Sequence, residues 1–573
     1  MHELATANHQ RVGIRQQTGN MTQRAALIQY VVAVLVAEYR ASHSAILRSI
    51  ERWGINRSIA TEIVINTESK LDYFTFIELV KNRHPNKHLI VMHDDIFFGE
   101  DFFARLLEQI AIIENAGVKW GVLGPAGVTY PYFKIVRNLV DYHGILYPFW
   151  RPLPATHLDG HCLVIHEAVD LAFDPDYRGF HHYDTLLCMQ AWAQGLPVFV
   201  INLPLRHLGQ GNVPEWQERS SQLGHLLSKK YGNKALLTSM GPVKLNSSAG
   251  VSRDFYKDEV NPVLDRCFAH RKVADATIII MIDREDEADI REALLAVCAQ
   301  FTKPERVIVL CRPSFHESLE RLATFFGAFV EILIVCPDEE TADAPDDILL
   351  GCAGKLCEIL PDDGIVSVID SRTVIFPNYV SDFKKFFVYC FDDTRTIAAF
   401  DMNYAVADDA KASTGDGISS KLIAARKTET IEDIVPDNFV PLSSLAVPIG
   451  IFKSILGEYR YGSVLHDVFV LRLLERGRFF FLRRSGGFIR TSMSELQAKA
   501  KDDFKEIAVL SEFFRSTYPF SFLFMKKFQA HHNEIANGGR ERLLARKLSQ
   551  YPKVVGSIFW LNRMVKKVRN IRV

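Results

Sequence analysis

The sequence predicts an α/β protein made of two tandem domains, each with a mostly parallel sheet, followed by a basic helical tail. Short apolar runs rich in Val and Ile alternate with helical patterns, which indicates parallel strands joined by helices. The pattern starts near residue 29 and again near residue 274. At 573 residues, the chain is also too long for a single hydrophobic core.

The composition is that of a globular protein in a reducing compartment. Hydrophobic residues make up 48% of the chain and charged residues 24%, with a net charge of −1, so no global field favours nucleic acid as a partner. The nine cysteines are scattered without a CxxC pair, which argues against a disulfide framework and a structural zinc site. With no signal peptide and no apolar run of about 18 residues, we expect a cytoplasmic location.

The pattern also predicts domain boundaries. We expect a flexible polar leader over 1–28, a first domain over 29–235 and a linker over 236–273. A second domain is expected over 274–520 and a basic amphipathic helical tail over 521–573.

The first domain is expected to alternate strands and helices. Its predicted strands are Tyr30–Ala37, Thr61–Asn66, Leu89–Met92, Trp120–Gly124, Cys162–Ile165 and Pro197–Leu203. Its predicted helices are one capped by Ser42, then Phe74–Val80, Asp101–Asn115, one that begins at Asp184, and Trp216–Lys230.

The third strand ends in His93, Asp94 and Asp95. Ligands of open α/β sheets bind at the carboxyl ends of strands. Two adjacent carboxylates repel one another unless a cation, a partner or water offsets the repulsion, and oxygen ligands favour Mg²⁺ or Mn²⁺. The sequence therefore predicts a divalent metal site here, with a solvated Asp-Asp turn as the alternative. Glu38 and Glu68 follow the two preceding strands, where an acid often binds a ribose hydroxyl.

Two later segments carry further polar residues. His181, His182, Tyr183 and Asp184 lead into a helix, and the alternative role of Asp184 is that of an N-cap. His207 follows the strand Pro197–Leu203 and precedes a loop with two glycines.

These motifs, in this order over about residues 29–212, resemble the family-2 glycosyltransferases, which have the GT-A fold. The resemblance places His93-Asp94-Asp95 where the family has Asp-x-Asp, and Tyr183-Asp184 where it has its Glu-Asp pair. It implies a metal site of His93, Asp95 and His207, with Asp184 as catalytic base. It also implies that the nucleotide sugar lies near Glu38, Glu68, Asp94 and Asp159.

Such a site would perform an inverting transfer. A divalent metal, Mn²⁺ or Mg²⁺, would offset charge on the diphosphate leaving group. Asp184 would take the proton from a hydroxyl of a glycan or lipid-linked acceptor as it attacks the anomeric carbon. The resemblance thus implies a hexosyltransferase that uses a nucleotide-sugar donor.

The second half resembles the same family more weakly, over about 274–500. Its predicted strands are Thr277–Ile282, Arg306–Cys311, Val330–Cys336 and Ile365–Ile369, with helices over Ile290–Gln300 and Phe315–Phe326. The resemblance places Asp283, Asp370 and Arg372 at the nucleotide sugar and Asp467 as base. Because Arg372 stands where the family has an acid, two interpretations stay open: transfer without a tightly held metal, or a non-catalytic acceptor-binding or scaffold module.

The tail from Arg540 is rich in Lys and Arg interleaved with apolar residues. This pattern is typical of a helix that binds an anionic membrane surface, with a helix packed on its own protein as the alternative. We therefore expect synthesis of a surface polysaccharide or glycolipid at the inner leaflet. The alternatives are a non-catalytic glycan- or nucleotide-binding scaffold and a metal-dependent phosphoester hydrolase that uses His93, Asp94, Asp95 and His207.

Overall fold

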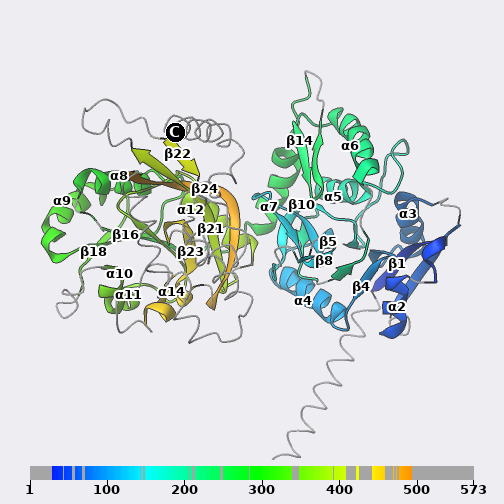
Figure 1. Cartoon of the computed structure of the whole chain (residues 1–573), viewed down its shortest axis with the longest axis horizontal. Coiled ribbons are helices and arrows are strands. Elements are labelled where there is room, and N and C mark those ends of the chain that lie inside the picture. The colour runs from blue at the N-terminus through cyan, green and yellow to red at the C-terminus, as the bar shows by residue number, and fades with distance from the viewer. Residues whose placement is uncertain are drawn as a thin grey trace, which may run out of the picture.

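The protein contains two α/β domains side by side (Figure 1). The computed structural model describes residues 29–492, apart from 43, 54–58, 68–70, 142–143, 146–148, 204, 210–212, 246–249, 283, 285, 338–347, 392, 408–420, 425–441, 458–468, 470–472 and 474–475. The predicted tandem α/β class is confirmed. The predicted leader and basic tail lie outside the described residues.

The first domain holds a nine-stranded sheet and a smaller four-stranded sheet. Its strands are β1 (Tyr30–Ala37), β2 (Ala60–Asn66), β3 (His88–His93), β4 (Ile96–Phe98), β5 (Val122–Gly124), β6 (Ala126–Thr129), β7 (Ile135–Arg137), β8 (Leu139–Asp141), β9 (Gly144–Ile145), β10 (Leu153–Leu158), β11 (Cys162–Ile165), β12 (Val198–Val200) and β13 (Leu205–His207). Its helices are η1 (Glu38–Arg40), α2 (Ala45–Arg52), α3 (Tyr73–Arg83), α4 (Phe102–Asn115), α5 (Tyr183–Ala193) and α6 (Val213–Ser228).

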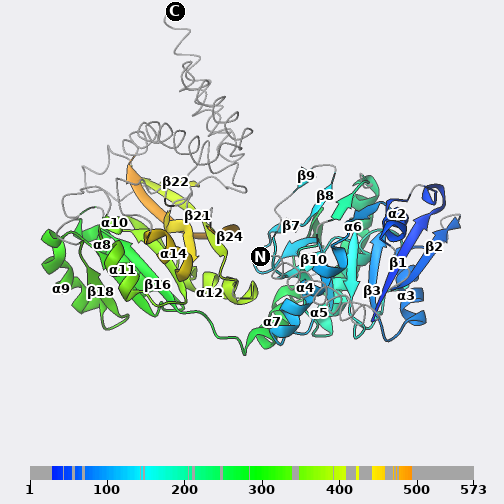
Figure 2. The same ribbon diagram turned by 90° about the horizontal axis from the view of Figure 1, so that it is seen from below.

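Strand β1 is the centre of the parallel part of the large sheet, whose order is β2-β1-β3-β11-β5-β12-β10-β6-β7. It pairs in parallel with both β2 and β3. Its Val-rich sequence is buried over nearly its whole length, as expected of a strand covered on both faces. Helices α2 and α3 lie on opposite sides of this strand (Figures 1 and 2). Beyond β3 the sheet is mixed, because β11 runs antiparallel to β3.

The second domain repeats this plan. Its strands are β16 (Ala276–Met281), β17 (Arg306–Leu310), β18 (Ile332–Val335), β19 (Ile365–Asp370), β20 (Thr373–Ile375), β21 (Thr396–Ala407), β22 (Lys421–Ala424), β23 (Leu445–Pro448) and β24 (Arg478–Ser492). Its helices are α8 (Glu287–Cys298), η5 (Pro313–Phe315), α9 (His316–Phe326), α10 (Ile348–Gly351), α11 (Ala353–Ile359), α12 (Tyr379–Tyr389), η7 (Leu442–Ser444) and α14 (Ile449–Leu456). Strand β16 pairs in parallel with β17 and β19, and an antiparallel strand, β23, follows β19. The same arrangement surrounds β1 in the first domain.

Aromatic side chains of both domains meet in one continuous core. Phe480 of β24 stacks on Phe386 of α12, with ring centroids 5.1 Å apart, and Tyr132 of the first domain lies 5.6 Å from Phe386. The indole Nε1 of Trp150 donates a hydrogen bond of 2.6 Å to Asp393 Oδ2 in the second domain. The two domains therefore share buried apolar surface.

The segment expected as a linker is structured. It contains the end of the hairpin β14 (Ala235–Thr238) and β15 (Gly241–Lys244), then η4 (Phe255–Val260) and α7 (Asn261–Phe268). Tyr130 of the first domain donates to Asn261 Oδ1 at 2.6 Å. This segment is thus packed on the first domain and is not an extended linker.

The N-cap predicted for α2 was wrong by two residues. Ser44, not Ser42, precedes the helix, and its hydroxyl accepts from Leu47 N at 3.5 Å.

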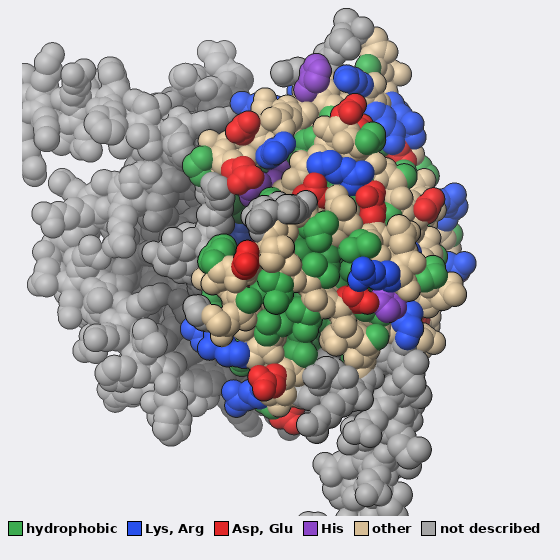
Figure 3. Space-filling view, turned by 90° about the vertical axis from the view of Figure 1, so that its right-hand side faces the viewer, with side chains coloured by type: hydrophobic (Ala, Val, Ile, Leu, Met, Phe, Trp, Pro, Cys, Tyr) green, Lys and Arg blue, Asp and Glu red, His purple; other side chains and the backbone are tan. Residues whose placement is uncertain are grey.

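Among the described residues, no helix has the length and apolar character needed to span a membrane. Figure 3 shows the side of the first domain that bears β2 and α3, where apolar side chains gather within a charged rim. Ile63 and Ile65 of β2 are among the exposed apolar residues.

Candidate active site

The turn between β3 and β4 carries two acids in different environments. Asp94 is buried, and its Oδ2 accepts from Ala37 N at 3.0 Å, at the end of β1. Its carbonyl oxygen accepts from the Ser44 hydroxyl at 2.8 Å, at the start of α2. Asp94 therefore ties three elements together at the rim of the sheet, and most of its hydrogen-bonding capacity is used inside the protein.

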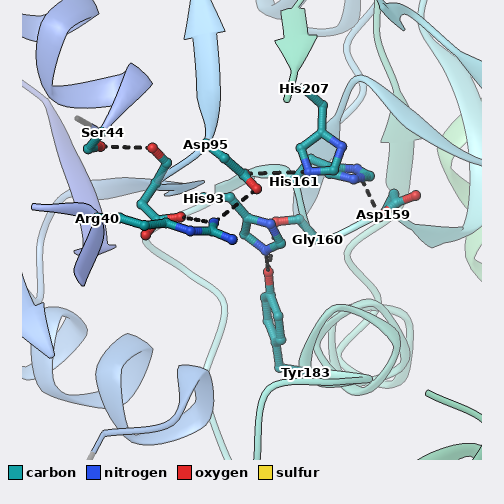
Figure 4. A network of polar contacts seen from close by, with 10 residues as sticks. Arg40, Ser44, His93, Asp95, Asp159, Gly160, His161, Tyr183 and His207 are labelled. Atoms are coloured by element: carbon teal, nitrogen blue, oxygen red, sulfur yellow. Dashed lines mark hydrogen bonds and ion pairs between the residues drawn. The ribbon is translucent and has the colours of Figure 1, made fainter. Parts of the chain in front are cut away.

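Arg40 forms ion pairs with both acids. Its Nη1 lies 2.9 Å from Asp94 Oδ1 and 3.2 Å from Asp95 Oδ2 (Figure 4). Arg40 sits on η1, directly after β1, and its side chain remains partly exposed. Burial by itself would lower the pKa of Arg40, but the two carboxylates raise it above its usual range. The cation that offsets the repulsion is thus a side chain of the chain itself.

Three predicted ligands converge on one point of this rim. The ligand atoms of His93, Asp95 and His207 lie within 4.8 Å of one another, and among the described residues this is the one such group of His, Cys, Asp and Glu. Antiparallel pairing of β13 with β4 sets His207 opposite Ile96, beside the turn. A β carbon added to Gly209 would lie 2.2 Å from Asp95 Oδ2, so the absence of a side chain there allows the close approach.

The group suits a divalent metal ion. Asp95 Oδ1 is buried without a hydrogen-bond donor among the described residues, and His207 Nε2 lies 3.4 Å away, too far for a good hydrogen bond. Burial would raise the pKa of Asp95, but His207, His93 and Arg40 hold it well below its usual range. A buried carboxylate oxygen with free acceptor capacity next to two imidazoles is a donor set that can hold a divalent metal ion.

His93 is held by helix α5 as well as by its own strand. Its Nε2 lies 2.8 Å from the Tyr183 hydroxyl, which donates to Gly160 O at 2.7 Å. The ring of Tyr183 stacks on that of Tyr73, with centroids 4.6 Å apart. Burial, together with the positive charge of His161, lowers the pKa of His93 to about 3, so the imidazole is neutral at pH 7.

Asp184 follows Tyr183 in the first turn of α5 but is not the N-cap. The N-cap is His182, in the left-handed region at φ 63°, and Asp184 Oδ1 accepts from Thr185 N at 2.7 Å. Asp184 lies close to Tyr183, since a β carbon added to Gly160 would be 2.3 Å from the Tyr183 hydroxyl and 3.2 Å from Asp184 Oδ2. Burial raises the pKa of Asp184 above its usual range, although His157 opposes the rise.

A series of buried and partly buried hydrogen bonds lies behind Asp184. The Thr185 hydroxyl lies 3.3 Å from Asp184 Oδ1 and 3.1 Å from His157 Nδ1. His182 Nε2 lies 2.9 Å from the Ser220 hydroxyl of α6. The carboxylate is thus anchored on one side and has its other oxygen, Oδ2, beside Gly160.

Asp159 forms an ion pair with His161. Its Oδ1 lies 2.9 Å from His161 Nδ1, and its Oδ2 accepts from the Ser239 hydroxyl at 3.0 Å. Burial would raise the pKa of Asp159, but His161 lowers it well below its usual range. The ring of His161 lies 4.1 Å from that of His207 between centroids. Asp159 therefore positions a histidine next to the candidate metal ligands.

The remaining predicted residues fall into three groups. Glu38 is exposed on η1, at the same rim as Arg40. Glu68, Asp283 and Asp467 lie outside the described residues. In the second domain Asp370 accepts from Arg372 N at 3.0 Å and from the Thr373 hydroxyl at 2.7 Å, so this acid is engaged within its own turn.

Sequence reasoning did not assign Arg40, His161 or Tyr183 a role in the site. Arg40 could have been recognised from its position right after the first strand, since its neighbour Glu38 was chosen on that basis. The roles of His161 and Tyr183 depend on contacts between segments far apart in the chain, for which the sequence carries no signal.

The fold and the site define an α/β protein with a candidate metal centre at the carboxyl end of its central strands. No protein-family model matches the chain. A Fuscovulum blasticum protein named ATP synthase subunits region ORF 6 is 24% identical over 196 residues, which are 33% of this chain and 78% of that protein.

Solved structures show partial similarity of fold. Staphylococcal TarS (S. aureus) matches with a TM-score of 0.25 and 13% identity over 38% of this chain and 60% of that one. Its complex with UDP-GlcNAc matches with a TM-score of 0.26 and 12% identity over 38% and 58%. The chain thus spans less than two thirds of either TarS chain, and what its site can do follows from its own residues.

Proposed function

We propose that the first domain is an inverting glycosyltransferase, which moves a sugar from a nucleotide-sugar donor to a hydroxyl of a glycan or lipid-linked acceptor. The observation that carries this proposal is the convergence of His93, Asp95 and His207 from β3, its following turn and β13. The half-buried carboxylate of Asp184 belongs to the residue that follows Tyr183, the hydrogen-bond partner of His93. The order of these motifs along the chain, which resembles that of family 2, supports the same assignment.

Each group then has a chemical task. A divalent ion, Mn²⁺ or Mg²⁺, would be held by His93, Asp95 and His207 and would supply positive charge to the leaving diphosphate. Asp184 accepts the proton of the acceptor hydroxyl as that oxygen attacks the anomeric carbon. Its raised pKa makes it a stronger base than an exposed carboxylate. Attack from the face opposite the diphosphate inverts the anomeric centre.

The experiment is a screen of nucleotide sugars with the purified chain and Mn²⁺, in which released nucleotide is measured with and without candidate acceptors. We expect release that needs both metal and acceptor and that falls in Asp95→Asn and Asp184→Asn. Asp170→Asn, at an exposed position, is the matched control. Release independent of acceptor would support a hydrolase, and no release with any donor would favour a binding scaffold.

We further infer that the second domain is a non-catalytic acceptor-binding or scaffold module. In that domain Asp370 is hydrogen-bonded to Arg372 N and to the Thr373 hydroxyl, so its carboxylate is engaged within its own turn. Asp467→Asn should therefore leave transfer unchanged.

Synthesis of a surface polysaccharide or glycolipid at the inner leaflet, with the basic tail on anionic lipid, is proposed from the sequence alone. Flotation of the full chain and of one cut before residue 521 with anionic vesicles tests the membrane contact.

A further inference from the structure

The hydroxyl of Tyr183 lies between a carbonyl oxygen and an imidazole nitrogen. It is 2.7 Å from Gly160 O and 2.8 Å from His93 Nε2. A carbonyl oxygen can only accept, so the single proton of the hydroxyl points to Gly160. His93 Nε2 must then be the donor in the second hydrogen bond, which places the ring proton of the neutral imidazole on Nε2 and leaves a lone pair on Nδ1.

Tyr183 is held firmly in this position. Its side chain is 2% exposed, and its ring is stacked on Tyr73 with an interplanar angle of 11°. Gly160 has no side chain that would collide with the hydroxyl. Figure 4 shows His93 between Tyr183 on one side and Asp95 on the other. The described residues provide no other side-chain hydrogen bond to His93, so Nδ1 is the nitrogen with a lone pair to offer.

We propose that Tyr183 is a positioning residue that fixes His93 in the Nε2–H tautomer and thereby presents Nδ1 as a ligand to a divalent transition-metal ion. This inference rests on the proposed function, because it concerns the same metal centre. Histidine ligands commonly donate their second ring N–H to an oxygen atom, and loss of such a partner lowers metal affinity roughly 10–100-fold. Since Tyr183 precedes Asp184 on α5, the same contact links the metal centre to the helix that carries the proposed base.

The test compares Tyr183→Phe with Tyr73→Phe in the full chain. Both variants keep the stacked pair of rings, but only the first removes the acceptor for His93 Nε2–H. We expect Tyr183→Phe to bind Mn²⁺ at least tenfold more weakly by titration calorimetry, and Tyr73→Phe to bind it within about twofold of the wild type. Thermal unfolding of both variants shows whether the fold is kept.

Nitrogen NMR of the histidine rings gives a readout that needs no metal. The signal of His93, assigned by its loss in His93→Gln, should show a protonated Nε2 and an unprotonated Nδ1 in the wild type, and a mixture of tautomers in Tyr183→Phe. An unchanged tautomer or an unchanged Mn²⁺ affinity in a folded Tyr183→Phe protein would overturn the proposal.

The result also separates this inference from the proposed function. A wild-type chain that binds Mn²⁺ and transfers sugar, with a Tyr183→Phe variant of equal affinity, overturns the positioning role alone. A wild-type chain that binds no Mn²⁺ overturns the metal centre itself and the inference with it.

Discussion

Two side chains at the rim of the sheet, those of Arg40 and His207, lie close to the carboxylate of Asp95. Asp95 is approached by the guanidinium of Arg40 at 3.2 Å and by the imidazole of His207 at 3.4 Å. A metal ion bound to Asp95 would have to tolerate the positive charge of Arg40 or displace it. Asp94 also pairs with Arg40, at 2.9 Å, and accepts a hydrogen bond from Ala37 N, so both of its carboxylate oxygens are engaged within the protein.

Replacing Arg40 with Gln should therefore strengthen metal binding. Removal of the competing cation is expected to raise Mn²⁺ affinity about tenfold, equivalent to roughly 1.4 kcal/mol, in titration calorimetry. Arg83→Gln is the control. Arg83, on α3, forms an ion pair with Glu62 on β2 and not with Asp95. Equal or weaker Mn²⁺ binding in Arg40→Gln would show that Arg40 does not compete.

The carboxylate of Asp184 is expected to lower the stability of the fold at pH 7 and to be needed for transfer. Its pKa is raised in the folded state, so its contribution to stability is fully present below the unfolded pKa and is lost as pH rises through the folded pKa. Asp184→Asn is expected to unfold at a higher temperature than the wild type at pH 7, with a gain that shrinks towards pH 4. Transfer should fall by roughly 10²–10⁴-fold.

Thermal melts across that pH range, paired with transfer assays, check both effects. Asp170→Asn, an exposed substitution, serves as the reference for each. A stability difference that stays constant with pH would contradict the assigned titration.

At the scale of elements, the site is a junction of strand ends and helix starts. At the end of β1, Ala37 N donates a hydrogen bond to Asp94 Oδ2. At the N-cap of α2, the Ser44 hydroxyl donates to the carbonyl oxygen of Asp94. Antiparallel pairing of β4 with β13 brings His207 to this junction. Hydrogen bonds to one turn thus join these elements at the rim of the sheet.

Ser44→Ala should expose this dependence. The substitution removes both the N-cap of α2 and the donor to Asp94 O. We expect a loss of about 1–2 kcal/mol in the free energy of unfolding, in the range of a lost N-cap, measured by urea denaturation. Glu51→Gln on the exposed side of the same helix should change stability little, and an equal loss in both variants would count against the capping role.

For the whole molecule, the shared aromatic core predicts cooperative unfolding. Phe480 of the second domain is 3% exposed and lies 4.9 Å, between ring centroids, from Phe149 of the first. Burial of apolar surface by both domains couples their stabilities, because neither can unfold without exposing the other's side of the interface. We therefore expect a single thermal transition in the wild-type chain.

Phe480→Ala should split that transition in scanning calorimetry. A cavity at the interface costs about 3–5 kcal/mol and removes one of the aromatic contacts that couple the domains. Phe326→Ala on α9, also buried but within the second domain, should lower stability by a similar amount without the same loss of coupling. If both variants unfold in the same way, the interface does not couple the domains.

The sequence alone determined the tandem α/β class, most strands of the parallel half and the residues His93, Asp95, Asp184 and His207. The strands, His93, Asp95 and His207 follow from local information, an apolar run of strand length or polar residues that follow it, and Asp184 follows from the resemblance of its motif to that of family 2. The assignment of metal and base to those residues stays a prediction, while the structure brings the ligand atoms of His93, Asp95 and His207 within 4.8 Å of one another.

Only the tertiary structure decided how these residues are held. Arg40 reaches Asp94 and Asp95 across more than 50 positions of the chain, and Tyr183 reaches His93 across 90. Such contacts depend on which strands and helices lie side by side, which arises from the packing of the whole core. Periodicity within a short segment carries no information about which distant segment will lie beside it.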